Sequence, residues 1–508
     1  GSMAPTLLGD NLPFQSDQTG YEWTVNPWYA SDGNNAPIQR QVSVTDPMTT
    51  NNAAFSVDAP GASVRPRNAP GYILPPRNKR LRPGDRILVL KYIYSLLEPT
   101  RFDVVVFKNP ADASQNYIKR LVGLPGEEVL IVAGDIFTRM VGAPDDAWAV
   151  RRKPRHIQQR LWRPQYSSDY RPLAAADDVG PTPTSIRSGT DPSGLSETFY
   201  FSEPWLSDTF RLHEHTGYRN DAGIGELRWN TSHWPVTDRV PYNEAVLSAG
   251  LARYPVPDLR MRAGVRPDSA GMSLAARIKT LGHEFSVTID GGDVRLTRRP
   301  LDVDVADRVK AATIEPLPAG KVTNIAFCHV DQSLQLWIND KLVLEDDYDD
   351  WSPIQRLQFA TERSPDEIMD RQRERELLAP DTYWPNLPEV TWEFNGAVTL
   401  YRVGLDRDIY YEPYASGADF IGLATLPSHT AKLNGDQYFC LGDNSPASLD
   451  GRGWNDVDKT IAETIDSTRG VVPRKLIIGK AFFVYFPGPH EFAGRTLIPD
   501  TGDMRIIH

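Results

Sequence analysis

The sequence contains only two cysteines, Cys328 and Cys440, in 508 residues. Two cysteines cannot build a disulfide framework, and no group of Cys and His residues has the ligand spacing of a zinc site. We therefore expect two buried thiols, no metal and no cofactor. The nine histidines offer no recognisable catalytic motif, so any catalytic site has to be sought among other residue types.

Long apolar runs are also absent. No stretch approaches the roughly 18 residues that cross a bilayer, and there is no secretory signal peptide pattern. The chain begins with Gly1-Ser2-Met3, which looks like an engineered start. The absence of a membrane segment is therefore a property of this stretch of sequence and need not hold for the natural protein.

Basic residues are outnumbered, with 55 Lys and Arg against 66 Asp and Glu and a formal net charge of −11. A nucleic-acid-binding domain usually presents a basic face, so we expect no nucleic-acid partner. Hydrophobic residues make up 40% and charged residues 24% of the chain, which is typical of a folded protein. A single core rarely serves so long a chain, and we expect two or three domains.

Short apolar or alternating runs, punctuated by Gly, Pro and Asn, occur near both ends of the chain. They lie at 86–90, 103–107, 117–122, 129–132, 438–441 and 477–486. This is the pattern of a β-meander. We predict a mainly β protein whose catalytic β domain is split in sequence, with a first part at 1–140 and a second part at 416–508.

The middle of the chain carries a second set of strand signals. Runs flanking 290–293 and 339–341 predict two hairpins, and 398–403 predicts a further strand. We expect an inserted, jelly-roll-like β-sandwich at 190–415.

Three other segments have weaker patterns. Residues 141–190 are polar and Pro-rich and predict a linker. Residues 10–70 predict an extended, loop-rich insertion with one short strand at 20–25. A charged surface helix is expected to begin after Ser364 and to stop at Pro380.

Four segments in chain order resemble the sequence boxes of type I signal peptidases. Residues 2–7 (Ser-Met-Ala-Pro-Thr-Leu) are similar to the nucleophile box. Residues 84–87 with 101–110 are similar to the second box, and 117–126 (Tyr-Ile-Lys-Arg-Leu-Val-Gly-Leu-Pro-Gly) are close to the lysine box. Residues 442–452 are similar to the last box. Together they cover about a third of the chain, at its two ends.

The resemblance implies a Ser/Lys endopeptidase that cleaves signal peptides of exported proteins after small residues. Ser2 would be the nucleophile, its backbone N–H part of the oxyanion hole, and Lys119 the general base. Ser448 would orient the lysine, Asp450 and Arg452 would form a supporting ion pair, and Gly442, Asp443 and Asn444 would form the turn beneath them. It also implies an extracytoplasmic catalytic domain, held at the membrane surface by an N-terminal anchor that this chain lacks.

The chemistry is consistent with these residue types. A serine hydroxyl becomes a good nucleophile only when a base takes its proton. A lysine can be that base only when neutral, and burial lowers its pKa from the usual value of about 10.4. Lys119 alternates with Tyr117 and Leu121 on one face of the expected strand, which is compatible with burial.

Several positions depart from the family pattern or have a second interpretation. Gly-Ser-Met is also a common remnant of tag removal, so Ser2 is either native or a cloning residue. Ser445 stands where the family has arginine, Gly451 where it has serine, and Phe102 where it has glycine.

The insert resembles concanavalin-like and laminin-G-like sandwiches around 326–340 and 398–400. Trp337 would be either a sugar platform or, more simply, an aromatic packed between two sheets. Two rival hypotheses follow. The peptidase part could be a weak or inactive scaffold whose insert binds a glycan or an envelope protein, or the insert could restrict which substrates reach a working site.

Overall fold

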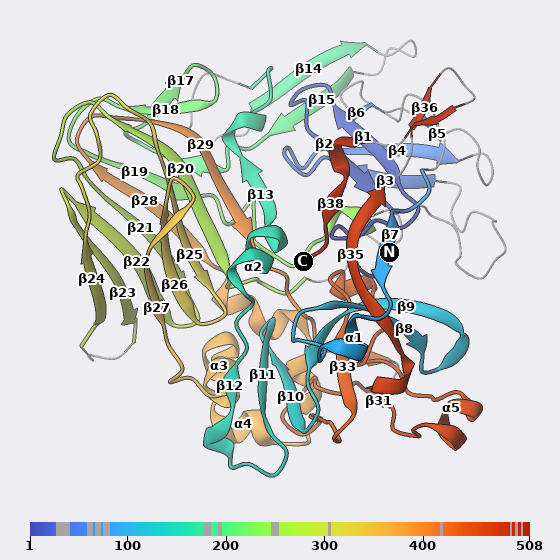
Figure 1. Ribbon diagram of the computed structural model, residues 1–508. Helices are drawn as coiled ribbons and strands as arrows, with labels where there is room; N and C mark the ends of the chain where they lie inside the picture. The colour runs from blue at the N-terminus through green and yellow to red at the C-terminus, as the bar shows by residue number, and fades with distance from the viewer. Residues whose placement is uncertain are drawn as a thin grey trace.

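The computed structural model describes residues 1–26, 41–57, 64–66, 73–74, 82–175, 184–190, 196–244, 253–302, 306–416, 420–487, 490–492, 496–498 and 501–508. Within these residues the protein is built mostly from antiparallel β-sheets (Figure 1). The predicted mainly β fold is confirmed.

One sheet is made from both ends of the chain. Its hydrogen-bonded order is β34-β33-β9-β8-β35-β38, with β7 also paired to β35. The strands are β7 (Arg86–Leu90), β8 (Val104–Asn109), β9 (Asp112–Gly123), β33 (Gln437–Leu441), β34 (Val472–Pro473), β35 (Ile477–Phe486) and β38 (Arg505–Ile506). In Figure 1 the blue β7, β8 and β9 lie beside the red β35 and β33. The prediction that the two ends fold together is confirmed.

A second, smaller sheet continues from this one in the order β12-β11-β10-β32. It contains β10 (Glu127–Val132), β11 (Asp135–Met140), β12 (Ala149–Val150) and β32 (Ala431–Lys432). Its pairing of β10 with β32 again joins the early and late parts of the chain.

The middle of the chain forms two large sheets. One has the order β17-β18-β29-β20-β25-β26-β27, and the other β16-β19-β28-β21-β22-β23-β24. The first comprises β17 (Arg211–His213), β18 (Gly217–Asn220), β29 (Val398–Arg407), β20 (Leu259–Pro267), β25 (Thr323–Val330), β26 (Ser333–Ile338) and β27 (Lys341–Asp347). The second comprises β16 (Trp205–Leu206), β19 (Ile224–Trp229), β28 (Glu389–Asn395), β21 (Ser273–Thr280), β22 (His283–Asp290), β23 (Asp293–Pro300) and β24 (Arg308–Thr313).

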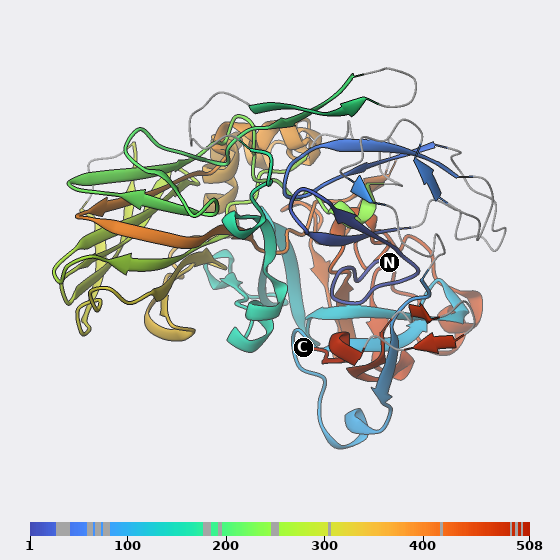
Figure 2. The same ribbon diagram turned by 90° about the horizontal axis from the view of Figure 1, so that it is seen from above.

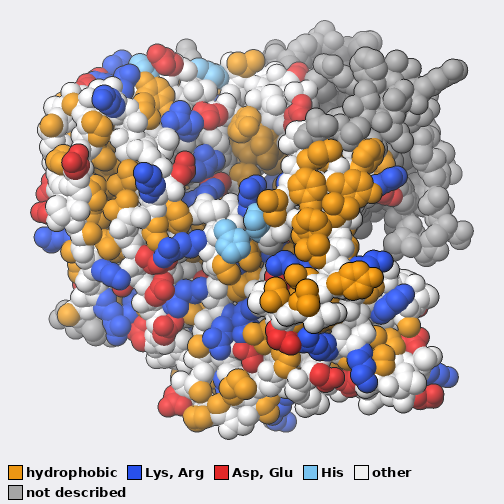
Figure 3. All heavy atoms as spheres, viewed as in Figure 1, with side chains coloured by type: hydrophobic (Ala, Val, Ile, Leu, Met, Phe, Trp, Pro, Cys, Tyr) orange, Lys and Arg blue, Asp and Glu red, His pale blue; other side chains and the backbone are white. Residues whose placement is uncertain are grey.

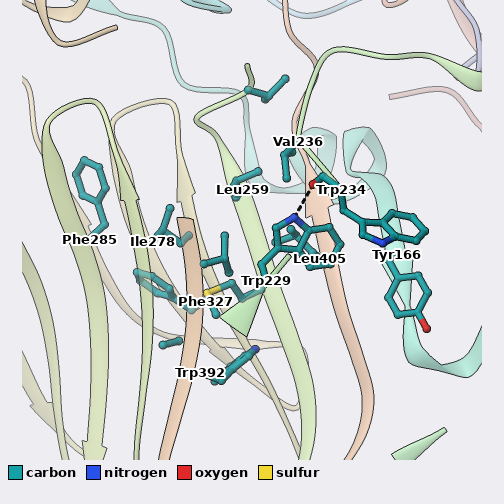
Figure 4. Close-up of a cluster of buried hydrophobic side chains, with 14 of the residues drawn as sticks. Tyr166, Trp229, Trp234, Val236, Leu259, Ile278, Phe285, Phe327, Trp392 and Leu405 are labelled. Carbon is teal, nitrogen blue, oxygen red and sulfur yellow. Dashed lines mark hydrogen bonds between the residues drawn. The ribbon is translucent and has the colours of Figure 1, made fainter. Parts of the chain in front are cut away.

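These sheets pack face to face. Strands of both contribute buried side chains to one hydrophobic cluster, which includes Phe285 and Trp392 from one sheet and Phe327 and Leu405 from the other (Figure 4). The clean alternation of buried and exposed residues on β28 is the pattern of a strand with one face on such a core. The predicted sandwich is therefore present, beside the split domain (Figure 2).

Two segments differ from their prediction. Residues 10–70 contain β1 (Leu12–Ser16), β2 (Glu22–Val25), β3 (Gln41–Thr45), β4 (Asn52–Val57) and β5 (Val64–Pro66), where one strand was expected; 27–40, 58–63 and 67–70 lie outside the described residues. Phe14 and Trp23 are buried in the sandwich cluster. Apolar residues that are widely spaced in the sequence thus come together only in the folded structure. β6 (Ile73–Leu74) pairs with β1.

The segment 141–190, predicted as a linker, is also structured. It holds α2 (Arg155–Leu161) and β13 (Arg163–Ser167), and β13 pairs with β29 of the sandwich. Pro164 hid this strand in the sequence, because proline usually argues against a paired strand; the pairing has a register shift at Pro164 that accommodates it.

The charged helix after Ser364 is shorter than predicted. Ser364 caps α4 (Pro365–Met369) in a capping box with Glu367, but the helix ends at Met369. The Asp370 side chain accepts a hydrogen bond from the backbone N–H of Gln372, a local bond that competes with helix continuation.

The remaining helices and strands are short. They are α1 (Ile93–Leu96), α3 (Pro353–Thr361), α5 (Lys459–Thr464), β14 (Thr184–Thr190), β15 (Ser196–Phe201), β30 (Ala415–Ser416), β31 (Phe420–Ile421), β36 (His490–Phe492) and β37 (Thr496–Ile498). None of the helices in the described residues has the length and apolar character needed to span a membrane.

Candidate active site

The first nine residues lie against the turn that follows β33. The backbone N–H of Asn444 donates to the carbonyl oxygen of Ser2 over 3.0 Å, and the Asn444 side-chain amide donates to the carbonyl of Gly1 over 3.0 Å. The Thr6 hydroxyl donates to the Asp443 carboxylate over 2.7 Å. The turn therefore holds a segment that lies more than 400 positions away in the sequence.

Lys119 lies on β9 and its amino group faces this segment. Its Nζ donates to Ser2 Oγ over 2.5 Å and to Ser448 Oγ over 3.2 Å. The side chain is buried, and the Tyr117 ring lies 5.5 Å from Nζ. The two hydroxyls proposed from the sequence, those of Ser2 and Ser448, thus both contact the Lys119 amino group.

Burial lowers the pKa of Lys119 to about 8. The negative charge of Asp450 opposes this shift by favouring the ammonium form, and the positive charge of Arg452 adds to it. Because Asp450 is itself paired with Arg452, the two charges partly cancel at Nζ and desolvation dominates. A neutral amine is therefore accessible a little above neutral pH.

Asp450 and Arg452 form a fully buried, bidentate ion pair. Arg452 Nε donates to one carboxylate oxygen over 2.9 Å and Nη2 to the other over 2.8 Å. The same carboxylate accepts the backbone N–H of Gly442 over 3.0 Å. Ser445 accepts from Arg452 Nη1 over 2.7 Å, so this departure from the family pattern supplies an acceptor for Arg452.

Sequence reasoning missed Arg120. Its guanidinium makes a second bidentate pair, with Asp443, through bonds of 2.8 and 2.6 Å, and both side chains are fully buried. Adjacent strand residues point to opposite faces, and here both faces of β9 are covered. The burial of Arg120 could not be predicted, because sequence alone does not show the cover on the second face.

Phe102 has a backbone φ of 72°, in the left-handed region. This explains why the family's glycine would suit the position. Phe102 is buried, and its carbonyl accepts from Arg120 Nη1 over 2.9 Å. Its packing and this hydrogen bond oppose the cost of the unusual backbone, which is about 1–3 kcal/mol.

A cavity of about 400 Å³ opens beside Ser2 and Lys119. Its apolar lining comes from four parts of the chain: Met3 and Leu7, Ile87 on β7, Ile118 on β9, and Leu449 in the last box.

One group of carboxylates has the proximity of a metal site. Asp135, Asp258 and Asp331 lie close together and buried. Arg356 lies 3.0 Å from Asp135 and 3.3 Å from Asp258, and Lys153 lies 2.5 Å from Asp331. These two cations already occupy the place that a metal ion would take, so the residues present do not fit one.

Trp337 lies half-buried on β26. It packs against a small cluster with Trp162 and Cys328, and its indole N–H donates to Gln335 over 3.0 Å. The other cysteine, Cys440, is also buried, as expected.

Comparison with known proteins matches the two ends of the chain to one family. The family model for "Signal peptidase, peptidase S26" matches residues 77–154 and 409–486. These two segments contain Lys119 and the last box, and the strands within them pair in one sheet. The chain thus contains a signal-peptidase-type β domain interrupted by the sandwich.

Three curated relatives illustrate the match. The chain is 43% identical over 61 residues to signal peptidase I of Buchnera aphidicola, covering 10% of this chain and 20% of that protein. It is 41% identical over 63 residues to a probable signal peptidase I-2 of Synechocystis, covering 11% and 28%. It is 40% identical over 68 residues to signal peptidase I of Aquifex aeolicus, covering 13% and 27%. The matched part is therefore a minor fraction of each relative.

Among solved structures, a carbohydrate-binding module, CBM66 from Bacillus subtilis, covers 40% of this chain and 95% of its own, at 10% identity and a TM-score of 0.23. A likeness at that level indicates nothing about a ligand of this chain.

Gly442 provides a test of this packing. A Cβ there would lie 2.2 Å from Ser448 Oγ and 2.4 Å from the carbonyl oxygen of Ser2, so Gly442→Ala has to displace both groups. We expect a loss of about 1–3 kcal/mol in unfolding free energy. Gly435→Ala is the matched control, because nothing lies within 4 Å of its Cβ. Equal urea midpoints for both variants would contradict the described packing.

Proposed function

We propose that this chain is a serine endopeptidase of the signal peptidase type, with Ser2 as nucleophile and Lys119 as general base. The observation that carries the proposal is the contact of 2.5 Å between Lys119 Nζ and Ser2 Oγ at a buried amine. A nucleophile within hydrogen-bond reach of a base whose pKa is lowered toward neutrality is the arrangement that acyl transfer needs.

Acylation would begin with neutral Lys119 taking the proton of Ser2 Oγ. The oxygen attacks the carbonyl carbon of the scissile bond, and the negative charge moves to the carbonyl oxygen. By the family resemblance, the backbone N–H of Ser2 would donate to that oxygen. The intermediate collapses as the ammonium of Lys119 protonates the leaving amine, which leaves an ester on Ser2.

Deacylation would use the same amine. Neutral Lys119 takes a proton from water, the hydroxide attacks the ester, and Ser2 Oγ recovers the proton when the acid product leaves. Ser448 would hold Nζ through its bond of 3.2 Å. Asp450, Arg452 and the turn Gly442-Asp443-Asn444 are positioning residues in this proposal, because they hold Ser448 and Ser2 in place.

The proposed substrate is the signal peptide of an exported protein, cut after small residues. The preference for small residues follows from the family resemblance. The cavity beside Ser2 supports a peptide with apolar side chains, since Met3, Leu7 and Ile87 line it. The matched segments span 20–28% of the length of the relatives named above.

We further propose that the domain works at an extracytoplasmic membrane surface. Exposed apolar side chains gather over β7, α1, β35 and β38 (Figure 3), and β7 also contributes Ile87 to the cavity. They include Leu88, Leu90, Tyr92, Leu96, Leu97, Tyr485 and Ile506. Large exposed apolar patches mark interaction sites, and a lipid surface here would place the cavity near membrane-bound substrates.

The rival in which the peptidase part is only a scaffold makes a different prediction. A scaffold would not form an ester on Ser2 with a lipopeptide inhibitor of signal peptidases, whereas the proposed enzyme would. Mass spectrometry of the treated protein distinguishes the two.

The catalytic pair can be tested by replacement. Lys119→Met and Ser2→Ala should each reduce cleavage of a signal-peptide substrate by about 10³-fold or more, because both groups act in one unit. Lys108→Met is the control, since Lys108 lies on the neighbouring strand β8 without facing Ser2. Full activity of Lys119→Met with an intact fold would refute the dyad.

The pH dependence follows from the lowered pKa of Lys119. Below its pKa of about 8 the amine is protonated and cannot accept the serine proton. We therefore expect kcat/KM to rise with pH through about 8 and then to level off. Ser448→Ala should shift this midpoint, because it removes a group that contacts Nζ. A midpoint near the ordinary lysine value would contradict burial of the amine in solution.

The membrane surface can be tested with vesicles. The double change Leu96→Asp and Leu97→Asp should weaken binding to phospholipid vesicles, because it places charge on a patch that would contact lipid. Leu173→Asp serves as the control, since Leu173 is equally exposed but lies outside the patch. Co-sedimentation measures binding, and cleavage of a soluble peptide should be unchanged; equal sedimentation of both variants would contradict the surface.

A further inference from the structure

A short turn from the sandwich part of the chain reaches the last box. The turn at Pro241–Asn243 lies between β19 and β20, one strand of each sandwich sheet. In Figure 2 it is the short light-green coil close to the N-terminus. At its end Asn243, which is 2% exposed, meets Asn444, which is fully buried. The sandwich thus supplies a buried polar side chain to the turn that holds Ser2.

The two asparagine side chains form a reciprocal pair. Asn243 Nδ2 donates to Asn444 Oδ1 over 2.6 Å, and Asn444 Nδ2 donates to Asn243 Oδ1 over 2.8 Å. Asn444 Nδ2 also donates to the backbone carbonyl of Gly1 over 3.0 Å. Because a carbonyl can only accept, this bond fixes which end of the Asn444 amide is the nitrogen, and the pairing then fixes the Asn243 amide.

Asn243 satisfies groups of Asn444 that would otherwise be left unpaired. Within the part of the chain that the structure describes, no other group donates to Asn444 Oδ1. Without Asn243, this buried acceptor and one buried N–H of the same amide would lose their partners, which is costly. The Asn444 side chain would turn toward any water that enters, and its bond to Gly1 would no longer be fixed.

Asn444 is the residue through which this pairing acts on the site. Its backbone N–H donates to the carbonyl oxygen of Ser2 over 3.0 Å. It also precedes the 3₁₀ turn Ser445–Ala447, which leads directly into Ser448. Both hydroxyls that contact the Lys119 amino group are therefore tied to the position of Asn444.

The turn that carries Asn243 is itself held by the sandwich. Arg407 of β29 donates to the carbonyls of Asp238 and Arg239 over 3.1 and 2.8 Å. The Asp238 carboxylate accepts the backbone N–H of Tyr254 over 3.1 Å. A side chain can orient another group only if its own backbone is fixed, and here the groups that fix it belong to the sandwich.

We propose that Asn243 is a positioning residue of the peptidase site, and that the sandwich completes this site through it. The role rests on the proposed function, since only a reacting serine needs such positioning. Asn243 touches neither the substrate nor the reacting atoms, and it acts through Asn444. The sandwich is then neither a separate binding module nor only a barrier to substrates, because the geometry of Ser2 depends on it.

Asn243→Leu tests this role, because leucine has nearly the shape of asparagine but can neither donate nor accept a hydrogen bond. We expect kcat for a signal-peptide substrate to fall by about 10–100-fold, since small displacements of a reacting group have effects of this size. KM should change by less than about threefold, because Asn243 does not line the cavity beside Ser2.

Asn220→Leu is the matched control. Asn220 on β18 is also 2% exposed, and its side-chain amide donates to the carbonyls of Gly223 and Gly396 inside the sandwich. This variant should lose stability, measured by circular dichroism, without losing kcat at temperatures where it is folded. If Asn243→Leu does not fold, Asn243→Ala replaces it, because the smaller side chain leaves room for a water that satisfies Asn444 without orienting it.

The pKa of Lys119 gives a readout that a purely structural role would not change. Burial lowers this pKa to about 8, and a displaced Ser2 would admit water to the amine. Asn243→Leu should therefore raise the pKa toward the ordinary lysine value of about 10.4, and the midpoint of kcat/KM against pH should move upward with it. NMR titration of isotope-labelled lysine side chains measures this pKa without catalysis, and Lys119→Met identifies the signal. Asn220→Leu should leave the pKa unchanged.

A double variant tests the route of the effect. Asn243→Leu should have little further effect on kcat in an Asn444→Ala background, since the group on which Asn243 acts is gone. Unchanged kcat and unchanged Lys119 pKa in folded Asn243→Leu, an equal loss of kcat in Asn220→Leu, or additive effects in the double variant would each overturn the positioning role.

Failure of the proposed function has a different signature. If the unmodified protein forms no ester with the lipopeptide inhibitor, the proposed function is refuted, and with it the role of Asn243 in catalysis. The NMR titration would then still show whether Asn243 maintains the contact between Ser2 and Lys119.

Discussion

The removal of water from the Lys119 amino group is the constraint on which the site depends. A fully solvated lysine is protonated near neutral pH and cannot serve as a base, so the proposed mechanism requires that this one side chain be covered while a serine hydroxyl is kept against it. The cover comes from parts of the chain that are far apart: Ser2 from the start, and Ser448 and Asp450 from the last box. The split of the domain in sequence is therefore no obstacle, since the sheet pairs β9 directly with β33 and β8 with β35.

Because the sandwich is inserted, the chain connects the two domains twice. The first connection lies near Lys153 and the second near Asp408. These two residues meet, with Lys153 Nζ 2.8 Å from the Asp408 carboxylate. Lys153 also contacts Asp331 of the sandwich, and Arg356 joins Asp258 to Asp135 of β11. A buried ion network is a weak source of stability compared with apolar packing. It does disfavour alternative arrangements, because displacing the split domain or the sandwich would leave buried charges unpaired. We therefore interpret the network as a device that fixes how the insert joins the split domain.

The sequence predicted those elements whose signal is local. β35 matches its predicted bounds because a run of ten mostly apolar residues ends at Pro487, and the hairpin after Ile338 follows from Asn339 and Asp340, which take positive φ angles of 47° and 62°. It could not predict strands whose apolar residues are spaced widely or include proline, as in β1 and β13, because those are stabilised by partners far along the chain. The site residues came from family boxes. Arg120 was missed because its burial depends on Asp443 and on the chain end, whose His508 carbonyl accepts its Nη1.

The hydroxyl of Thr6 shows how the two halves of the molecule are joined at the site. It has one proton, which it donates to Asp443, so it can meet Arg163 only as an acceptor. That leaves a directed chain of contacts from Arg163 on β13, through Thr6 and Asp443, to Arg120 on the strand that carries Lys119. Each link is charge-assisted or fixes the direction of the next, and none uses the Lys119 amino group itself. The segment that bears Ser2 is thus held by the sandwich side as well as by the last box, and the position of Ser2, the proposed nucleophile, depends on both parts of the protein.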